Sequence, residues 1–257
     1  MDKRRIDINC DMGESSPLRP DYTLDQDMAL MEFVSSINLA CGFHAGDPRT
    51  MHLLTEVALE KGVAIGAHPS FPDREHFGRK KMAWSPEWLY DQIIYQLGAL
   101  DAFLSIRGTR LQHVKPHGAL YNMAATDKTM AQLLVKAVAD YDDRLILVGL
   151  SGSEMIQAAK ERGLRYANEV FADRTYQTNG TLTSRELPDA LLNTTEESIN
   201  QVMDICLNQQ VRTTDNKLIP LQADTVCIHS DGSSALQMAS GIYQALQMAG
   251  ITIRPCH

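Results

Sequence analysis

A recurring unit limits the folds that this chain can adopt. The unit consists of a short apolar run, a turn that carries a polar side chain, and a segment of helical period. Residues 37–48 show it most clearly. The run from Ile37 suits a buried parallel strand, and Asp47 and Pro48 are typical of a helix N-cap and a first helical residue. His44 therefore falls between a strand and a helix, at the edge where parallel α/β folds bind ligands.

Similar units follow along the rest of the chain. Runs that suit strands cover residues 5–11, 34–40, 63–67, 111–115, 145–148, 164–170, 225–228 and 251–254. Segments of helical period cover residues 24–33, 48–61, 85–107, 126–140, 153–162, 196–209 and 234–248. Simple alternation of strand and helix predicts a parallel sheet closed into a barrel. We therefore expect a distorted (β/α) barrel of about seven parallel strands, forming a single domain over residues 1–257.

Charge and hydropathy exclude several classes of protein. The formal net charge of −8 argues against a nucleic-acid partner, because phosphate neutralisation requires a basic face. The opening residues lead into a strand-like run without the apolar region of a signal peptide, and no apolar stretch approaches the length of a membrane span. We expect a cytoplasmic protein with no membrane partner.

The best candidates for chemistry are polar side chains that directly follow predicted strands. Parallel strands deliver such residues to one rim, so a group of them predicts a site, although any single member suits helix capping or loop packing equally well. The six are Asp11, His44, His68, His117, Asp173 and His229.

Two kinds of chemistry suit this set. Carboxylate oxygen and imidazole nitrogen are ligands for zinc or a similar divalent metal, with Asp11, His44, His68 and His117 as the candidates. The same residues can act without a metal, with a carboxylate that orients a histidine as general base. No His-Glu-x-x-His motif separates these interpretations, and the sequence leaves both open.

Cations near the predicted rim favour a small anionic substrate, either a carboxylate or a phosphate. A long loop over residues 71–84 interleaves aromatic and charged residues, which predicts a packed lid. Lys115 is the first cation to test because a strand should hold it rigidly. His113, within the same strand, is better explained as a core histidine. The cations are Arg74, Arg79, Lys80, Lys81, Lys115, Arg174 and Arg185.

Motifs for nucleotide binding are missing from the sequence. Neither Gly-x-x-x-x-Gly-Lys-Ser/Thr nor Gly-x-Gly-x-x-Gly follows any strand, and there is no Gly-x-Ser-x-Gly elbow. If the reaction uses ATP, another chain should bind most of it.

Taken together, five motifs resemble the LamB/YcsF family. The resemblance runs in order from Asp7 to about Arg185, and the motifs are specific. They are Asp-Ile-Asn-Cys-Asp-Met-Gly-Glu (7–14), Ala-Cys-Gly-Phe-His-Ala-Gly-Asp-Pro (40–48), Gly-Ala-His-Pro-Ser (66–70), Val-Lys-Pro-His-Gly-Ala-Leu-Tyr-Asn (114–122) and Glu-Val-Phe-Ala-Asp-Arg (169–174).

The resemblance implies a barrel of the glycoside hydrolase and deacetylase type. It also implies one component of an enzyme that works with partner subunits B and C, opening the lactam of 5-oxoproline to glutamate while ATP is hydrolysed. This chain departs from the family pattern at His76, after Arg185, and at Ser230 between His229 and Asp231, which weakens any role for His229. The motif positions that match are Asp11, His44, His68, Lys115, His117, Asp173 and Arg174.

Our leading hypothesis is that water attacks an activated lactam carbonyl. His44 or His117 is the base, Asp11 orients it, and Lys115 and Arg174 hold the anion. Two alternatives remain: a metal-dependent deacetylase of small acetylated sugars, and a non-catalytic subunit that presents substrate to a partner. The catalytic candidates are Asp11, His44, His68, Lys115 and His117; the substrate contacts are Asn9, Glu14, Arg79, Asn122, Asp173 and Arg174.

Overall fold

The computed structural model describes residues 4–192, 194–230 and 234–257, in which seven parallel strands form a closed barrel. The order around the barrel is β1, β2, β3, β4, β5, β6 and β9, and pairing of β9 with β1 closes it. β10 pairs only with the first two residues of β1, and β7 and β8 form a separate antiparallel hairpin. The strands are β1 Arg5–Met12, β2 Ser36–Ala40, β3 Ala64–His68, β4 His113–Val114, β5 Ile146–Leu150, β6 Arg165–Phe171, β7 Gln210–Arg212, β8 Leu218–Pro220, β9 Thr225–Ile228 and β10 Thr252–Ile253.

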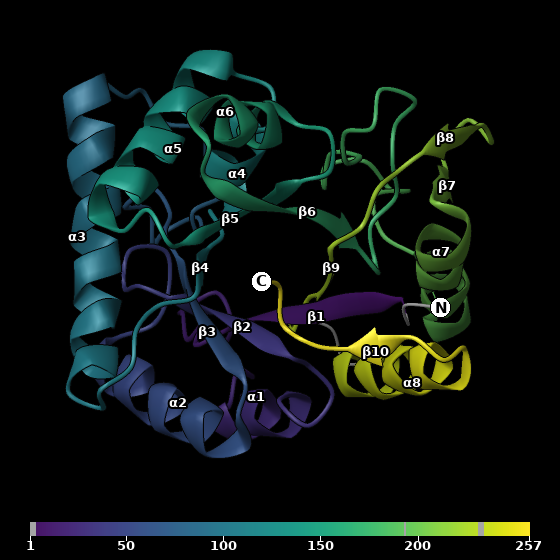
Figure 1. The fold of residues 1–257 in the computed structure, drawn as a ribbon, viewed down its shortest axis with the longest axis horizontal. Coiled ribbons are helices and arrows are strands. Elements are labelled where there is room, and N and C mark those ends of the chain that lie inside the picture. The colour runs from purple at the N-terminus through teal and green to yellow at the C-terminus, as the bar shows by residue number, and fades with distance from the viewer. Residues whose placement is uncertain (1–3, 193, 231–233) are drawn as a thin grey trace.

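Helices surround the barrel on the outside (Figure 1). The signals predicted for the start of α2 are confirmed: Asp47 caps its first turn and Pro48 opens it. Gly62 ends the helix in the left-handed conformation. The helices are α1 Leu24–Leu30, α2 Pro48–Lys61, α3 Pro86–Ser105, α4 Gly118–Ala124, α5 Lys128–Tyr141, α6 Glu154–Arg162, α7 Thr195–Asn208 and α8 Ala235–Met248.

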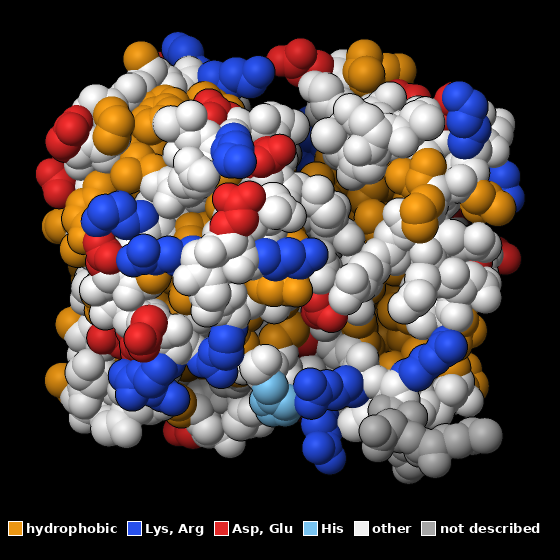
Figure 2. Space-filling model, turned by 45° about the horizontal axis from the view of Figure 1, so that its top comes forward, with side chains coloured by type: hydrophobic (Ala, Val, Ile, Leu, Met, Phe, Trp, Pro, Cys, Tyr) orange, Lys and Arg blue, Asp and Glu red, His pale blue; other side chains and the backbone are white. Residues whose placement is uncertain are grey.

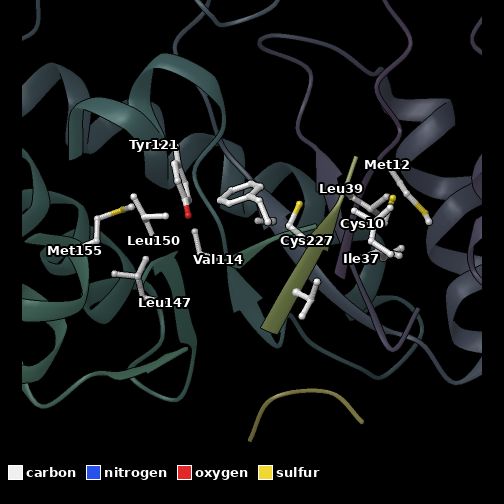
Figure 3. Packing of buried hydrophobic residues seen from close by; sticks show 14 of the residues in the cluster. Cys10, Met12, Ile37, Leu39, Val114, Tyr121, Leu147, Leu150, Met155 and Cys227 are labelled. Atoms are coloured by element: carbon white, nitrogen blue, oxygen red, sulfur yellow. The ribbon is translucent and has the colours of Figure 1, made fainter. Parts of the chain in front are cut away.

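Alternation along the strands separates an apolar layer from a polar interior. In β1, Ile8, Cys10 and Met12 belong to the main hydrophobic core, in which Figure 3 shows Cys10 and Met12 beside Ile37 and Leu39 of β2. The residues between them, Asp7, Asn9 and Asp11, point into the barrel, where hydrogen bonds to neighbouring strands satisfy them. The barrel therefore encloses polar groups, while its stability comes from the apolar layer outside it.

A cross-strand hydrogen bond inside the barrel requires Gly66. Asn38, Gly66 and His113 stand in register on β2, β3 and β4. The ring of His113 crosses over β3 so that its Nε2 lies 2.7 Å from Asn38 Oδ1. A Cβ at position 66 would lie only 2.1 Å from that nitrogen. Burial lowers the pKa of His113 to about 3, so this side chain is the neutral core histidine that the sequence predicts.

The C-terminal tail covers the end of the barrel where the strands begin, opposite their carboxyl ends. Cys256 packs against Ile146 and Val148 of β5, and its carbonyl accepts a hydrogen bond from Gln112 Nε2 at 2.8 Å. On the face that Figure 2 shows, acidic and basic side chains are interspersed. Among the residues described, none of the helices is both long enough and apolar enough to cross a bilayer.

The barrel of about seven parallel strands is confirmed, and several elements differ from prediction. α4, which begins at Gly118, was not predicted. The hairpin of β7 and β8 was not predicted. β4 is shorter than residues 111–115, and only His113 and Val114 form it.

Candidate active site at the barrel mouth

The carboxyl ends of the strands bring four of the predicted residues together. Asp11 lies on β1 and His68 is the last residue of β3. His44 lies in the loop between β2 and α2, and His117 occupies the N-cap position of α4. His68 Nε2 lies 3.0 Å from His117 Nδ1 and 3.3 Å from Asp11 Oδ2, and the rings of His44 and His117 stack with centroids 3.7 Å apart.

Hydrogen bonds at the outer edge of each ring determine where the protons lie. His68 Nδ1 donates to the carbonyl of Lys115 at 2.7 Å, and His117 Nε2 donates to the carbonyl of Phe77 at 2.9 Å. His44 Nδ1 donates to Ser70 Oγ at 2.9 Å, because the hydroxyl hydrogen of Ser70 is used on the carbonyl of Phe71. In the neutral rings, the inward nitrogens His44 Nε2, His68 Nε2 and His117 Nδ1 therefore carry lone pairs.

Glu14 completes this group, which we call the four-donor cluster: Glu14, His44, His68 and His117. Its Oε1 lies 3.1 Å from His44 Nε2, 3.3 Å from His117 Nδ1 and 3.8 Å from His68 Nε2. Burial lowers the pKa of both His44 and His117 well below the ordinary value, and the neighbouring histidines add to this. Four acceptor atoms thus meet in one buried space, and this arrangement suits a shared proton or a cation.

Hydrogen bonds to Asp27 of α1 fix the turn that carries Glu14. Gly13, with a φ of 72°, donates its N–H to Asp27 Oδ2 at 2.8 Å, and the hydroxyl of Tyr22 donates to the same oxygen at 2.6 Å. The other oxygen of Glu14 accepts from Arg19 at 3.3 Å. Burial raises the pKa of Asp27 to about 6, despite these hydrogen bonds.

We expect the Asp27→Asn variant to gain stability relative to wild type as the pH rises. The pKa of Asp27 in the folded protein lies above its ordinary value of 3.8, so ionisation between about pH 4 and pH 6 destabilises the folded state. The difference in unfolding free energy between variant and wild type should shift by about 3 kcal/mol in favour of the variant between pH 4 and pH 7. Urea unfolding across this range measures it. Asp25→Asn, an exposed change in the same helix, should show no such shift.

Asp11 is tied to a second buried group beneath the four-donor cluster. Its Oδ1 accepts from Lys115 Nζ at 2.8 Å and from Asn38 Nδ2 at 2.8 Å. The ammonium of Lys115 also lies 2.9 Å from Glu169 Oε1 and 3.0 Å from Cys227 Sγ. Burial opposes the charge on Lys115, but Asp11 and Glu169 hold its pKa well above the ordinary value. The ammonium therefore neutralises carboxylates inside the barrel.

The loop over residues 71–84 packs against the cluster, in agreement with the lid predicted there. Phe77 is buried with a φ of 56°, and its ring meets those of His44 and His117 edge to face. A Cβ on Gly78 would lie 2.8 Å from Cβ of His44. Arg74 donates to the carbonyls of residues 42 and 46 and so ties this loop to the one that carries His44.

Asp173, Arg174 and His229 follow β6 and β9, away from the strands that carry the histidines of the cluster. Arg174 is buried and donates to the carbonyls of residues 183 and 190. Burial, with Arg185 and Arg79 nearby, lowers its pKa to about 10. Asp173 lies 2.8 Å from His229 Nδ1. Burial opposes ionisation of Asp173, but His229 and the arginines hold its pKa below the ordinary value.

The remaining predicted residues lie farther from the cluster. Asn9 is inside the barrel, donating to Glu169 and Thr225. Asn122 is exposed on α4 and donates to the carbonyl of Gly118. Asp231 lies outside the described residues.

Glu169 and Ser70 were not singled out from the sequence. A signal for Glu169 existed, because an acidic residue in the otherwise buried strand β6 requires a partner inside the barrel. Ser70 had no comparable signal, since its role depends on where the ring of His44 lies.

The whole chain is similar to known proteins. The LamB/YcsF family model matches residues 6–257. A protein of Tolumonas auensis, named as the A subunit of 5-oxoprolinase, is 50% identical over 250 residues, covering 97% of this chain and 98% of that protein. A protein of the same name from Bacillus subtilis is 49% identical over 249 residues, covering 97% and 96%.

Solved structures resemble the fold. The crystal structure of a lactam utilization protein from Thermus thermophilus superposes with a TM-score of 0.88 at 40% identity, covering 97% of this chain and 99% of that one. A family 4 carbohydrate esterase from Streptomyces lividans, in complex with acetate, gives a TM-score of 0.51 at 10% identity, covering 97% and 91%. At that identity, the second likeness is one of fold alone.

Proposed function

This chain belongs to the LamB/YcsF family, as its motifs predict, and we propose that it is the A subunit of an ATP-hydrolysing 5-oxoprolinase. The enzyme hydrolyses the lactam of 5-oxo-L-proline to L-glutamate. The observation that carries the proposal is the barrel mouth, where histidine nitrogens and two carboxylates meet, with Arg79 over the Phe77 ring beside them and the buried Arg174 after β6. Relatives of that name match over nearly the whole chain, which supports the same activity here.

The substrate explains why such a mouth is needed. A five-membered lactam is a stable amide and a poor electrophile, so phosphorylation of its carbonyl oxygen makes attack by water feasible. The mouth must then hold an anion, position one water, accept a proton from it and return a proton to the ring nitrogen. Arg79 and Arg174 are the cations that we assign to the carboxylate or phosphate of the activated substrate.

We assign most of the ATP binding to partner subunits, which we identify as subunits B and C. The sequence has no Gly-x-x-x-x-Gly-Lys-Ser/Thr motif to cradle phosphates. The relatives are named as one lettered component of 5-oxoprolinase, which implies an assembly of several chains. In this division of labour, the present chain supplies the residues around the lactam.

Asp11 is the residue that we assign to the attacking water. Lys115 and Asn38 fix its Oδ1, which leaves Oδ2 on the side of His68. Burial opposes its ionisation, but His68 and Lys115 hold the pKa of Asp11 well below the ordinary value, so the carboxylate accepts a hydrogen bond from water. The proton that water loses can pass to His117 Nδ1, which carries no hydrogen in the neutral ring.

A divalent metal is the second ligand that we propose for the four-donor cluster. Three imidazole nitrogens and one carboxylate oxygen are a donor set typical of zinc, and outer hydrogen bonds to Ser70 Oγ and two carbonyls orient the rings as they do around bound metals. An ion held by Glu14, His44, His68 and His117 would lower the pKa of a water that joins it as a fifth ligand.

We expect the purified protein to bind one equivalent of Zn²⁺ or Co²⁺, with Co²⁺ giving the intense visible absorption of a four-coordinate site. His44→Ala should weaken binding by about 10-fold or more, because it removes one of four donors. Titration calorimetry and the Co²⁺ spectrum measure this. His52→Gln, on the outer face of α2, is the matched control and should bind as wild type does. Absence of binding by the wild-type protein would leave the cluster as a proton acceptor only.

Reconstitution tests the function itself. The purified chain, mixed with partner subunits B and C, ATP and 5-oxo-L-proline, should release glutamate together with phosphate. Omission of this chain should abolish glutamate release. Equal release without it, or none with all three subunits present, would overturn the proposal.

A further inference from the structure

Across the mouth from the four-donor cluster lies a dyad, His229 with Asp173, that the steps above leave without a role. The two residues follow β9 and β6, which are neighbours in the barrel with Phe171 opposite Cys227 in register. His229 Nδ1 lies 2.8 Å from Asp173 Oδ2 and 2.9 Å from Oδ1. Because an ionised carboxylate only accepts hydrogen bonds, Nδ1 carries a proton and Nε2 is the nitrogen left for chemistry.

The ring of His229 is held in a fixed orientation. It stacks on the ring of Phe171, with centroids 5.5 Å apart and planes at 18°. Phe171 is itself buried, and only 14% of the His229 side chain is exposed. A histidine on a buried platform, with a carboxylate behind it, has the arrangement of a general acid or base held by a positioning group.

The dyad faces the same reaction space as Asp11. A ring nitrogen of His229, a carboxylate oxygen of Asp11 and Cys227 Sγ all lie within 4.8 Å of one another. Asp11 in turn contacts His68 on the cluster side at 3.3 Å. A lactam whose carbonyl carbon is beside Asp11 would therefore have its ring nitrogen either toward the four-donor cluster or toward the dyad. On the side of the dyad, the imidazolium form of His229 is the proton donor.

We propose that His229 is the general acid that protonates the ring nitrogen as the lactam opens, and that Asp173 is its positioning residue. The inference rests on the proposed function. The oxygen of water bonds to the carbonyl carbon of the phosphorylated lactam, and the bond from that carbon to the ring nitrogen breaks. The electron pair of that bond takes the proton from His229 Nε2, and the imidazole regains a proton from solvent. The nitrogen leaves as an amine, since an amide anion is far too basic to depart. The acyl phosphate that remains is hydrolysed by a second water to glutamate and phosphate.

The test compares two leaving atoms in the reconstituted complex with ATP. One substrate is 5-oxo-L-proline, and the other is its ring-oxygen counterpart, a five-membered lactone with the carboxylate at the same carbon. An alkoxide leaves with much less help from an acid than an amide nitrogen does. His229→Gln should lower kcat for the lactam by about 10²-fold with little change in KM, and should lower kcat for the lactone only a few-fold. Asp173→Asn should show the same selectivity with a smaller loss.

Retained lactone turnover also shows that the variant is folded. Equal losses on both substrates would overturn the proposal, as would an unaffected lactam rate. The ¹⁵N isotope effect at the ring nitrogen gives an independent readout that does not need the lactone. It should grow in His229→Gln because cleavage of the C–N bond becomes slower, and an unchanged effect would contradict the role. Failure of the proposed function would appear separately, as a wild-type complex that releases no glutamate.

Discussion

The Asp11→Asn variant, assembled with partner subunits and supplied with ATP and 5-oxo-L-proline, is expected to release glutamate about 10³-fold more slowly than wild type. The substitution keeps the shape of the side chain but replaces one acceptor oxygen by a donor. If the amide nitrogen takes the place of Oδ2, the water loses its acceptor beside His68; if it takes the place of Oδ1, it meets the ammonium of Lys115. Either orientation removes the charge that orders the mouth.

The measurement is glutamate release at saturating substrate, followed with an enzyme-coupled assay. Asp91→Asn, an exposed change on α3, is the control and should retain full activity. Full activity in Asp11→Asn would remove this mechanism. A raised KM with an unchanged kcat would instead support the non-catalytic alternative, in which the chain only presents substrate to a partner.

The convergence of residues at the mouth could be predicted because it depends on strand direction alone. Residues that follow parallel strands lie at one rim of the barrel. The sequence shows four such residues after apolar runs, namely Asp11, His44, His68 and His117. The same reasoning applies to the barrel. Its strands were recognisable from apolar runs, and β9 has the predicted bounds Thr225–Ile228.

The pairing of side chains across the mouth could not be predicted, because the position of a residue in the sequence does not say how deeply its side chain is buried or which way it points. Asp11 was expected to orient His44 or His117, yet the carboxylate that contacts both is that of Glu14, which the turn at Gly13 folds back over the strand end. In the structure, Asp11 contacts His68.

The burial of a lysine at a strand end also decides whether its ammonium binds substrate or neutralises buried carboxylates. The sequence favoured Lys115 as a clamp for the substrate anion because a strand should hold it. The fold places it 2% exposed between Asp11 and Glu169. A partner such as Glu169, more than fifty residues away along the chain, becomes visible only when β4 and β6 are placed around one barrel.

The Lys115→Met variant should therefore be strongly destabilised, by about 3–5 kcal/mol in unfolding free energy. Methionine has a similar length and fills the space, so the loss comes mainly from electrostatics. Without the ammonium, the carboxylates of Asp11 and Glu169 remain buried with no cation between them. Urea unfolding at pH 7 measures the change. Lys128→Met, on an exposed side chain of α5 that pairs loosely with Glu161, is the control and should change stability by less than about 1 kcal/mol.

A second change separates charge from packing. Glu169→Gln made in the Lys115→Met background removes one of the uncompensated charges while keeping the shape of the side chain. It should recover stability, although the same change in wild type destabilises by taking a partner from Lys115. The double-mutant cycle should then give a coupling energy of about 1–3 kcal/mol between the two positions. Additive effects would mean that the ammonium of Lys115 does not stabilise the carboxylate of Glu169, and the electrostatic contribution of Lys115 would then come from its pair with Asp11.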